Sequence, residues 1–205
     1  MPAGAKARLF VAVDVPAAVC ERLCGWARAA AAGLRSESAD ARRSLRLLDP
    51  DSLHLTLCFL GSRPVEEIAA IGRALEACPA HLDELSLGAP LWLPRARPRA
   101  LAVAVQDEEG NLARLHAAVV EAICAATAWE PQRARFRAHI TVARTRGVRN
   151  RARGSPAGGG EGSPLAPTPA IRFTAESVTL YRSWLGPGGS TYEPLSSCQL
   201  VPAGL

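Results

Sequence analysis

The residues best suited to chemistry in this 205-residue chain are two His-x-Thr triplets, at positions 54–56 and 139–141. In an extended strand, alternate side chains point to opposite faces. His54 and Thr56 therefore share one face, as do His139 and Thr141, while apolar neighbours share the other. Each triplet predicts a strand with one buried face and one face that offers an imidazole beside a hydroxyl.

Such a pair suits acid/base catalysis at a phosphodiester. Histidine has an ordinary pKa near 6.5, so one imidazole can take a proton from the entering oxygen while the other gives one to the leaving oxygen. Threonine hydroxyls can donate hydrogen bonds to the non-bridging oxygens as charge develops. We expect His54 and His139 to be catalytic and Thr56 and Thr141 to bind the phosphate, with no metal or other cofactor.

Two arginines and the two remaining histidines are further candidates for the site. Arg137 precedes His139 by two residues, so a regular strand would put it on the same face as a further phosphate contact. Arg144 stands at odd spacing and is expected to point away unless the strand twists or ends. A metal site would need a third ligand from His81 or His116, for which we expect structural roles.

Charge and composition limit the class of protein. The net charge is +5, and Lys6 is the only lysine, so the excess is carried by arginine, which suits nucleotide or nucleic-acid phosphates. No apolar run reaches the roughly 18 residues that span a bilayer, and no signal peptide is apparent. We expect a cytoplasmic monomer. The six cysteines show no Cys-x-x-Cys spacing, and we expect small buried residues rather than disulfides.

The order of elements repeats in the two halves of the chain. A strand at 8–13 and a helix from Pro16 to Gly33 precede the first triplet, and a strand at 100–105 and a helix from Gly110 precede the second. This repeat predicts two similar lobes within one domain, 1–205. The Gly- and Pro-rich stretch 147–170 is expected to be a mobile insertion, and two strands near 171–181 and 191–200 form a hairpin.

Three segments together resemble a known family, the 2H phosphoesterases, and within it the bacterial RNA 2′,3′-cyclic phosphodiesterases, also called 2′-5′ RNA ligases. They are the runs at 9–16 (LFVAVDVP), 54–61 (HLTLCFLG) and 136–144 (FRAHITVAR). The resemblance covers nearly the whole chain except 147–170. Two departures are Ala138, where the family commonly has proline, and Leu47 with Leu48, where it often has an aromatic residue.

The resemblance implies a bilobal α+β fold, with two antiparallel sheets around a central cleft, helices outside and a pseudo-two-fold axis. It implies hydrolysis of RNA 2′,3′-cyclic phosphate ends to 2′-phosphomonoesters. His54 would be the proton donor to the leaving 3′ oxygen and His139 the acceptor that activates water. Three alternatives stay open: a small cyclic nucleotide as substrate, a 2′-5′ RNA ligase acting on tRNA halves, and a non-catalytic nucleotide- or RNA-binding module.

Overall fold

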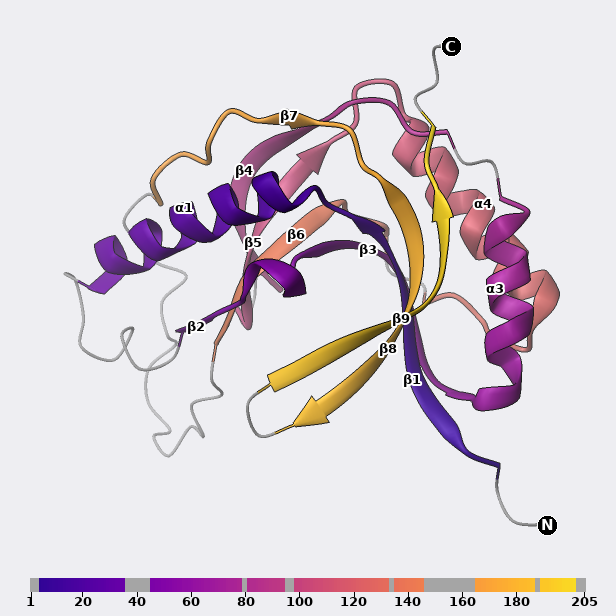
Figure 1. Cartoon of the computed structure of the whole chain (residues 1–205). Helices are drawn as coiled ribbons and strands as arrows, with labels where there is room; N and C mark the ends of the chain where they lie inside the picture. Colours follow the sequence, from indigo (N-terminus) through magenta and orange to yellow (C-terminus); the bar gives the residue numbers. More distant parts are fainter. Residues whose placement is uncertain are drawn as a thin grey trace.

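The computed structural model describes residues 4–35, 45–78, 81–94, 98–132, 135–145, 165–186 and 189–201. Within them the chain forms a curved nine-stranded sheet and three α-helices (Figure 1). Every strand pairing is antiparallel. The predicted α+β class with antiparallel strands is therefore confirmed.

The sheet places the two triplet strands side by side at its centre. Its order is β7 (Arg172–Phe173), β4 (Leu85–Leu93), β5 (Ala100–Gln106), β6 (His139–Thr145), β3 (His54–Pro64), β1 (Lys6–Asp14), β8 (Ser177–Gly186) and β9 (Gly189–Gln199), with β2 (Leu45–Leu47) on β6. The helices are α1 (Ala17–Arg35), α3 (Ile68–Glu76) and α4 (Asn111–Ala126), with short 3₁₀ turns η1 (Pro50–Ser52) and η2 (Val65–Glu67).

The prediction of two separate lobes with a sheet each was wrong. β3 and β6 pair directly, at Leu55 and Ile140, and this pairing joins the two halves into one sheet. Both side chains are fully buried, so the junction belongs to the common hydrophobic core. The repeat of elements is present, but its two copies are joined in one sheet where β3 pairs with β6.

All three helices cover the same face of the sheet. Alternate strand residues such as Leu9, Val11 and Val13 enter one core cluster with residues of α1, α3 and α4. In α4, the residues predicted to point inward are the buried ones: Leu112, Leu115, Val119 and Ile123. None of the helices in the described part of the chain is long and apolar enough to cross a membrane. The opposite, helix-free face carries the triplets.

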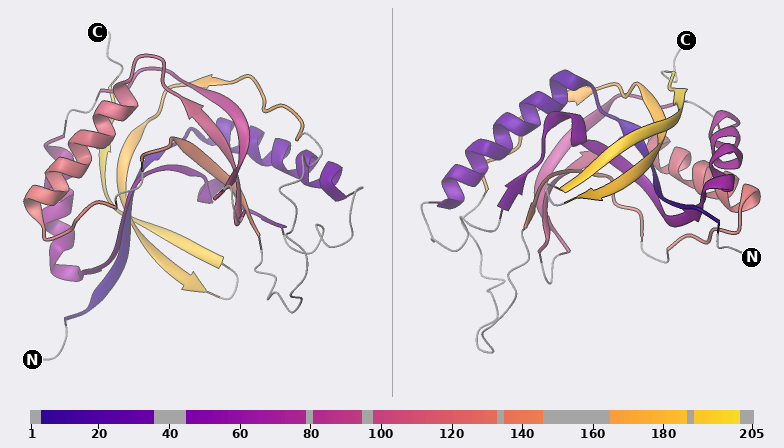
Figure 2. Two further views of the ribbon diagram at one scale, coloured as in Figure 1. Left: turned by 180° about the vertical axis from the view of Figure 1, so that it is seen from behind. Right: turned by 60° about the horizontal axis from the view of Figure 1, so that its bottom comes forward.

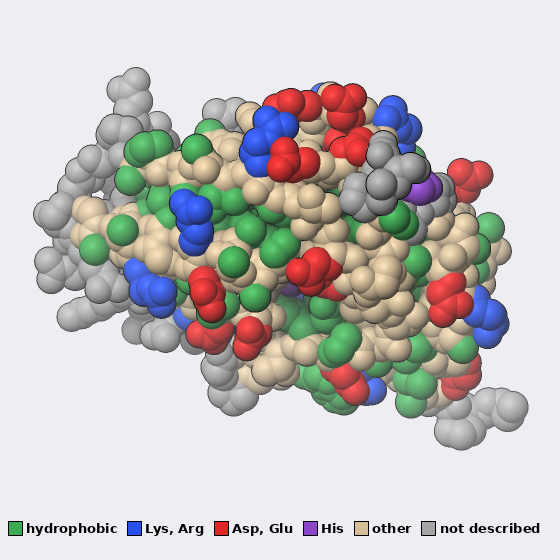
Figure 3. All heavy atoms as spheres, turned by 45° about the horizontal axis from the view of Figure 1, so that its top comes forward, with side chains coloured by type: hydrophobic (Ala, Val, Ile, Leu, Met, Phe, Trp, Pro, Cys, Tyr) green, Lys and Arg blue, Asp and Glu red, His purple; other side chains and the backbone are tan. Residues whose placement is uncertain are grey.

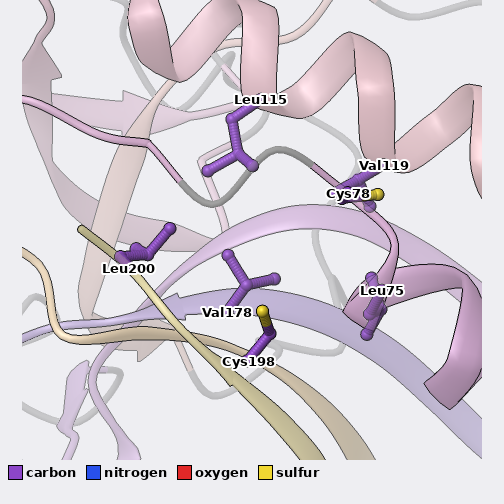
Figure 4. Close-up of a pocket in the computed structure, with 7 residues that line it drawn as sticks. All are labelled: Leu75, Cys78, Leu115, Val119, Val178, Cys198 and Leu200. Atoms are coloured by element: carbon purple, nitrogen blue, oxygen red, sulfur yellow. The ribbon is translucent and has the colours of Figure 1, made fainter. Parts of the chain in front are cut away.

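A small apolar cavity lies between α3, α4 and the end of β9 (Figure 4). Its volume is about 10 Å³, close to the smallest space that holds one water. The cavity is lined by Leu75, Cys78, Leu115, Val119, Val178, Cys198 and Leu200. All six cysteines are free, and Cys20 and Cys24 are buried as predicted.

Most of the Gly- and Pro-rich stretch predicted to be a mobile insertion lies outside the described residues. Its last part, 165–170, has no regular secondary structure. Trp26 Nε1 donates to the Ala166 carbonyl at 3.1 Å, and Thr168 Oγ1 donates to the Gly88 carbonyl at 2.6 Å. These two bonds tie the segment to α1 and β4.

The β8–β9 hairpin extends past the strand on which it pairs (Figures 1 and 2). β1 pairs with β8 only as far as Arg182, whereas β8 and β9 remain paired to Gly186 and Gly189. The outer part of the hairpin is therefore an arm held by its own two strands.

Candidate active site

The register of β3 against β6 arranges the two triplets around a local two-fold axis. Because Leu55 pairs with Ile140 in an antiparallel ladder, extending the register by one residue puts His54 opposite Thr141 and Thr56 opposite His139. Residues opposite each other share a face, and diagonal neighbours stand about 7–8 Å apart. The two imidazoles are therefore diagonal neighbours, each beside the other strand's hydroxyl.

Both triplet strands contain a β-bulge at the same place. The register of β3 against β1 skips Leu57, and the register of β6 against β5 skips Val142. In each strand two consecutive residues are buried at this point. A bulge shifts the alternation by one residue, so the fifth residue after each histidine turns onto the triplet face. These residues are Phe59 in β3 and Arg144 in β6, and both are exposed.

The expectation that Arg144 points away was wrong for this reason. It assumed a regular strand, in which odd spacing from His139 would mean opposite faces. The bulge at Val142 reverses that relation, and the positive charge of Arg144 acts on His54, lowering the pKa of its imidazole. Arg144 thus lies on the triplet face, near enough to His54 to act on it.

The two histidine rings are anchored in the same way. His54 Nδ1 lies 3.0 Å from the Ser52 carbonyl oxygen, and His139 Nδ1 lies 2.6 Å from the Arg137 carbonyl oxygen. A carbonyl oxygen only accepts hydrogen bonds, so Nδ1 carries the proton in both rings. Nε2 is then the nitrogen that takes up or releases a proton in each imidazole.

His54 stands among aromatic side chains. Its ring centroid is 4.9 Å from that of Phe10, 5.1 Å from Tyr192, which meets it edge-on, and 6.4 Å from Tyr181. Burial among these rings lowers the pKa of His54 to about 4, because loss of hydration disfavours the charged imidazolium. The hydrogen bond to Ser52 raises this pKa and the Arg144 charge lowers it further.

Asp14 is a component of the site that sequence reasoning did not find. It pairs with His54 across β1 and β3, and its negative charge raises the pKa of that histidine. Its carboxylate accepts hydrogen bonds from Ser177 and Thr179 at 2.6 Å each and from Tyr181 at 2.7 Å. Asp14 thereby ties β8 to the wall behind His54. The available signal was strand alternation, which puts Asp14 on the same face as residues 10 and 12 at the end of the first strand.

The remaining candidates lie at the edges of the site or away from it. Arg137 is exposed and precedes β6, which begins at His139, so the regular strand assumed for its side chain is absent and only its carbonyl contact is observed. His116 stacks on Phe136 with ring centroids 4.1 Å apart, and burial lowers its pKa. His81 is exposed. Among the described residues, no group of three His, Cys, Asp or Glu is arranged to hold a metal.

The fold defines a class of protein, the proteins with a LigT-like fold. The crystal structure of E. coli LigT complexed with 3′-AMP superimposes with a TM-score of 0.68 at 22% identity, covering 96% of this chain and 99% of LigT. The TT0787 protein of Thermus thermophilus superimposes with a TM-score of 0.65 at 26% identity, covering 94% and 97%. These similarities establish the fold.

A sequence relative establishes the family. The RNA 2′,3′-cyclic phosphodiesterase of Aeropyrum pernix is 30% identical over 120 residues, which are 58% of this chain and 68% of the relative. No protein-family model matches the chain. The chain belongs to the RNA 2′,3′-cyclic phosphodiesterase family, the LigT-like branch of the 2H phosphoesterases, and is a phosphodiesterase homologue, as the three sequence motifs predicted.

Proposed function

We propose that this protein hydrolyses RNA 2′,3′-cyclic phosphate ends to 2′-phosphomonoesters by acid/base catalysis between His54 and His139. The observation that supports this most is the antiparallel register of β3 and β6. It sets two imidazoles and two hydroxyls around one point on an open face of the sheet, which matches the needs of in-line displacement at phosphorus. The activity named for the Aeropyrum pernix relative adds independent support.

In the proposed reaction His139 Nε2 takes a proton from water, whose oxygen attacks the phosphorus. The bond from phosphorus to the ribose 3′ oxygen breaks, and His54 Nε2–H gives its proton to that oxygen. The 2′ oxygen keeps the phosphate, so the product is a 2′-phosphomonoester. In both rings Nδ1–H donates to a carbonyl, which leaves Nε2 to exchange the proton.

The lowered pKa of His54 sets a condition on this role. With a pKa of about 4 the free imidazole is neutral near pH 7, so the proton donor has to be charged in the complex with substrate. The bound phosphodiester carries a negative charge, and an opposite charge within about 4–6 Å raises the pKa of an imidazole. We infer that substrate binding raises the pKa of His54, so that its imidazole becomes protonated in the complex.

The phosphate contacts in this proposal come from both strands. Thr56 and Thr141 would donate hydrogen bonds to the non-bridging oxygens, each from beside the opposite strand's histidine. Arg144 would add a charge-assisted hydrogen bond on the His54 side. Arg137 is the further predicted contact, on the His139 side.

The experiment is product analysis of the purified protein on an oligoribonucleotide that ends in a 2′,3′-cyclic phosphate, with a chelator present. ³¹P NMR distinguishes the cyclic phosphate, the 2′-phosphate and the 3′-phosphate. We expect conversion to the 2′-phosphate by the wild type and none by a His54→Asn/His139→Asn double variant. Asparagine keeps a donor near the Nδ1 position and cannot exchange a proton, so the fold is expected to be retained.

Three other results would contradict the proposal. Equal conversion by the double variant would remove the histidines from the mechanism. Loss of turnover with the chelator would indicate a metal-dependent reaction. Tight binding of the oligoribonucleotide without conversion would favour a non-catalytic RNA-binding module.

A further inference from the structure

A pocket of about 510 Å³ lies between β2 and the outer part of the β8–β9 hairpin. This volume falls in the range of small-molecule sites, about 300–1,000 Å³. One wall is residues 46–49 with Ser52, and the other is residues 184–186 and 189–191. Neither triplet histidine nor either triplet threonine lines it, so it is a second space beside the candidate active site.

The pocket adjoins the His54 side of the site through Ser52. Ser52, in its wall, supplies the carbonyl that holds the His54 ring. Arg46, in the same wall, pairs directly with Arg144 across β2 and β6, so both guanidinium groups rise from the triplet face of the sheet. Arg144 thus stands next to a residue of the pocket wall, on the face that carries His54.

The hairpin wall offers an apolar surface beside a hydroxyl. Leu185 follows Tyr181 by four residues in β8 and so shares its face, the face on which Tyr181 and Tyr192 approach His54. Its side chain is 69% exposed. Ser190 pairs with Leu185 across the hairpin and therefore lies on the same face.

The end of the pocket is bounded by a contact between Arg46 and the hairpin. The guanidinium group lies against Gly189, where any Cβ would collide with it, and Gly189 has a φ of +123° that favours glycine. Arg46 thus reaches from β2 across to the arm. Among the described lining residues, Asp49 on the β2 wall is the one acidic side chain, and it suits a base amino group or a ribose hydroxyl.

On the face in Figure 3, the described basic side chains are scattered among acidic ones and form no continuous patch. RNA binding depends largely on neutralising backbone phosphates. Arg46 and Arg144, which pair across β2 and β6, supply this on the triplet face.

We propose that this pocket binds the RNA nucleotide on the 5′ side of the one that carries the cyclic phosphate. The inference rests on the proposed function: if His54 protonates the ribose 3′ oxygen, the ribose and the chain preceding it lie on the His54 side, toward Arg144 and the pocket. Arg46 takes the bridging phosphate, and Leu185 packs against the preceding base. The natural substrate is then an RNA chain and not a free cyclic mononucleotide.

The test compares kcat/KM for adenosine 2′,3′-cyclic phosphate and for the dinucleotide ApA with the same cyclic end. We expect the wild type to favour the dinucleotide by roughly tenfold or more. Arg46→Ala and Leu185→Ala should each remove most of this preference while leaving the mononucleotide kcat/KM unchanged. The controls are Arg73→Ala, which removes an exposed charge on α3, and Val201→Ala, which trims an exposed apolar residue elsewhere; both should retain the preference.

Equal kcat/KM for the mononucleotide and the dinucleotide would overturn the inference. So would variants that lower kcat/KM for both substrates by the same factor. Turnover of neither substrate would instead refute the proposed function. Calorimetric Kd values for 2′-AMP and for ApA ending in a 2′-phosphate then decide the inference separately. A wild-type preference for the dinucleotide that Arg46→Ala and Leu185→Ala reduce supports the pocket, and equal affinities overturn it.

Discussion

β3 and β6 follow the same backbone plan and differ in what surrounds them. Each carries a His-x-Thr triplet, anchors its histidine Nδ1 to a carbonyl two residues earlier, and bulges before the fifth residue after the histidine. That fifth residue is Phe59 in β3 and Arg144 in β6. His54 is packed among three aromatic rings, whereas the carbonyl that holds His139 belongs to the exposed Arg137.

A repeated motif fixes the backbone geometry of a strand but not the surroundings of its histidine. Geometry comes from local alternation and the bulge, which the two strands share. The lowered pKa of His54 comes from burial, beside the rings of Phe10, Tyr181 and Tyr192 on β1, β8 and β9. Two strands with the same backbone plan can therefore place their histidines in different surroundings.

The largest expected effect comes from removing either imidazole. His54→Asn and His139→Asn should each lower kcat/KM on a 2′,3′-cyclic phosphate substrate by about 100-fold or more, because general acid/base catalysis contributes about 10²–10⁴-fold. Steady-state kinetics measures this, with His81→Ala as a control at an exposed histidine. A variant with near-normal turnover would show that its strand does not take part in the proton transfers.

The next effect is on stability against pH. Unfolded His54 has a pKa near 6.5 and the folded ring about 4, so the unfolded state binds more protons between these values. The free energy of unfolding should therefore fall as pH is lowered from 6.5 to 4, by up to about 3 kcal/mol. Urea unfolding at several pH values measures it. His54→Asn should lack this part of the loss; identical pH dependence in both proteins would show that burial does not depress the pKa.

A smaller effect is expected at the fifth position of β6. Arg144→Ala should lower kcat/KM by about tenfold, since it removes a charge-assisted contact to the phosphate. It should also raise the pKa of His54, because the Arg144 charge lowers it. Kinetics and a histidine NMR titration measure the two effects, with Arg73→Ala as the charge-matched control. Unchanged values in both measurements would place Arg144 outside the site.

The smallest effect is expected at the fifth position of β3. Phe59 is 51% exposed and 6.3 Å, ring to ring, from Phe10. Phe59→Ala should change kcat/KM by only about two- to fivefold through lost packing against Phe10, and should leave the pKa of His54 unchanged. A loss as large as that of Arg144→Ala would show that the two strands contribute alike at this position.

Local features of this fold were predictable from sequence. The triplets were found because strand alternation is a two-residue pattern, and the buried face of α4 was found because Leu112, Leu115, Val119 and Ile123 recur at helical spacing. Neither depends on distant parts of the chain.

Features that depend on pairing were not predictable. The bulges at Leu57 and Val142 arise from registers with β1 and β5, and without them Arg144 was assigned to the wrong face. The sequence could not show that β3 and β6 pair at Leu55 and Ile140. Both residues would be apolar and buried whether the strands belonged to one sheet or to two. The aromatic surroundings of His54 include Tyr192, which is more than a hundred residues away in sequence.

The most direct test of the central claim, that His54 and His139 act as a pair on one phosphate, is an imidazole ¹⁵N NMR titration of both rings with and without bound 2′-AMP. We predict that free His54 stays neutral, with its proton on Nδ1, down to about pH 4. Nucleotide binding should raise the pKa of His54 and shift the Nε2 signals of both rings. Titrations unaffected by the nucleotide in either ring would contradict the account.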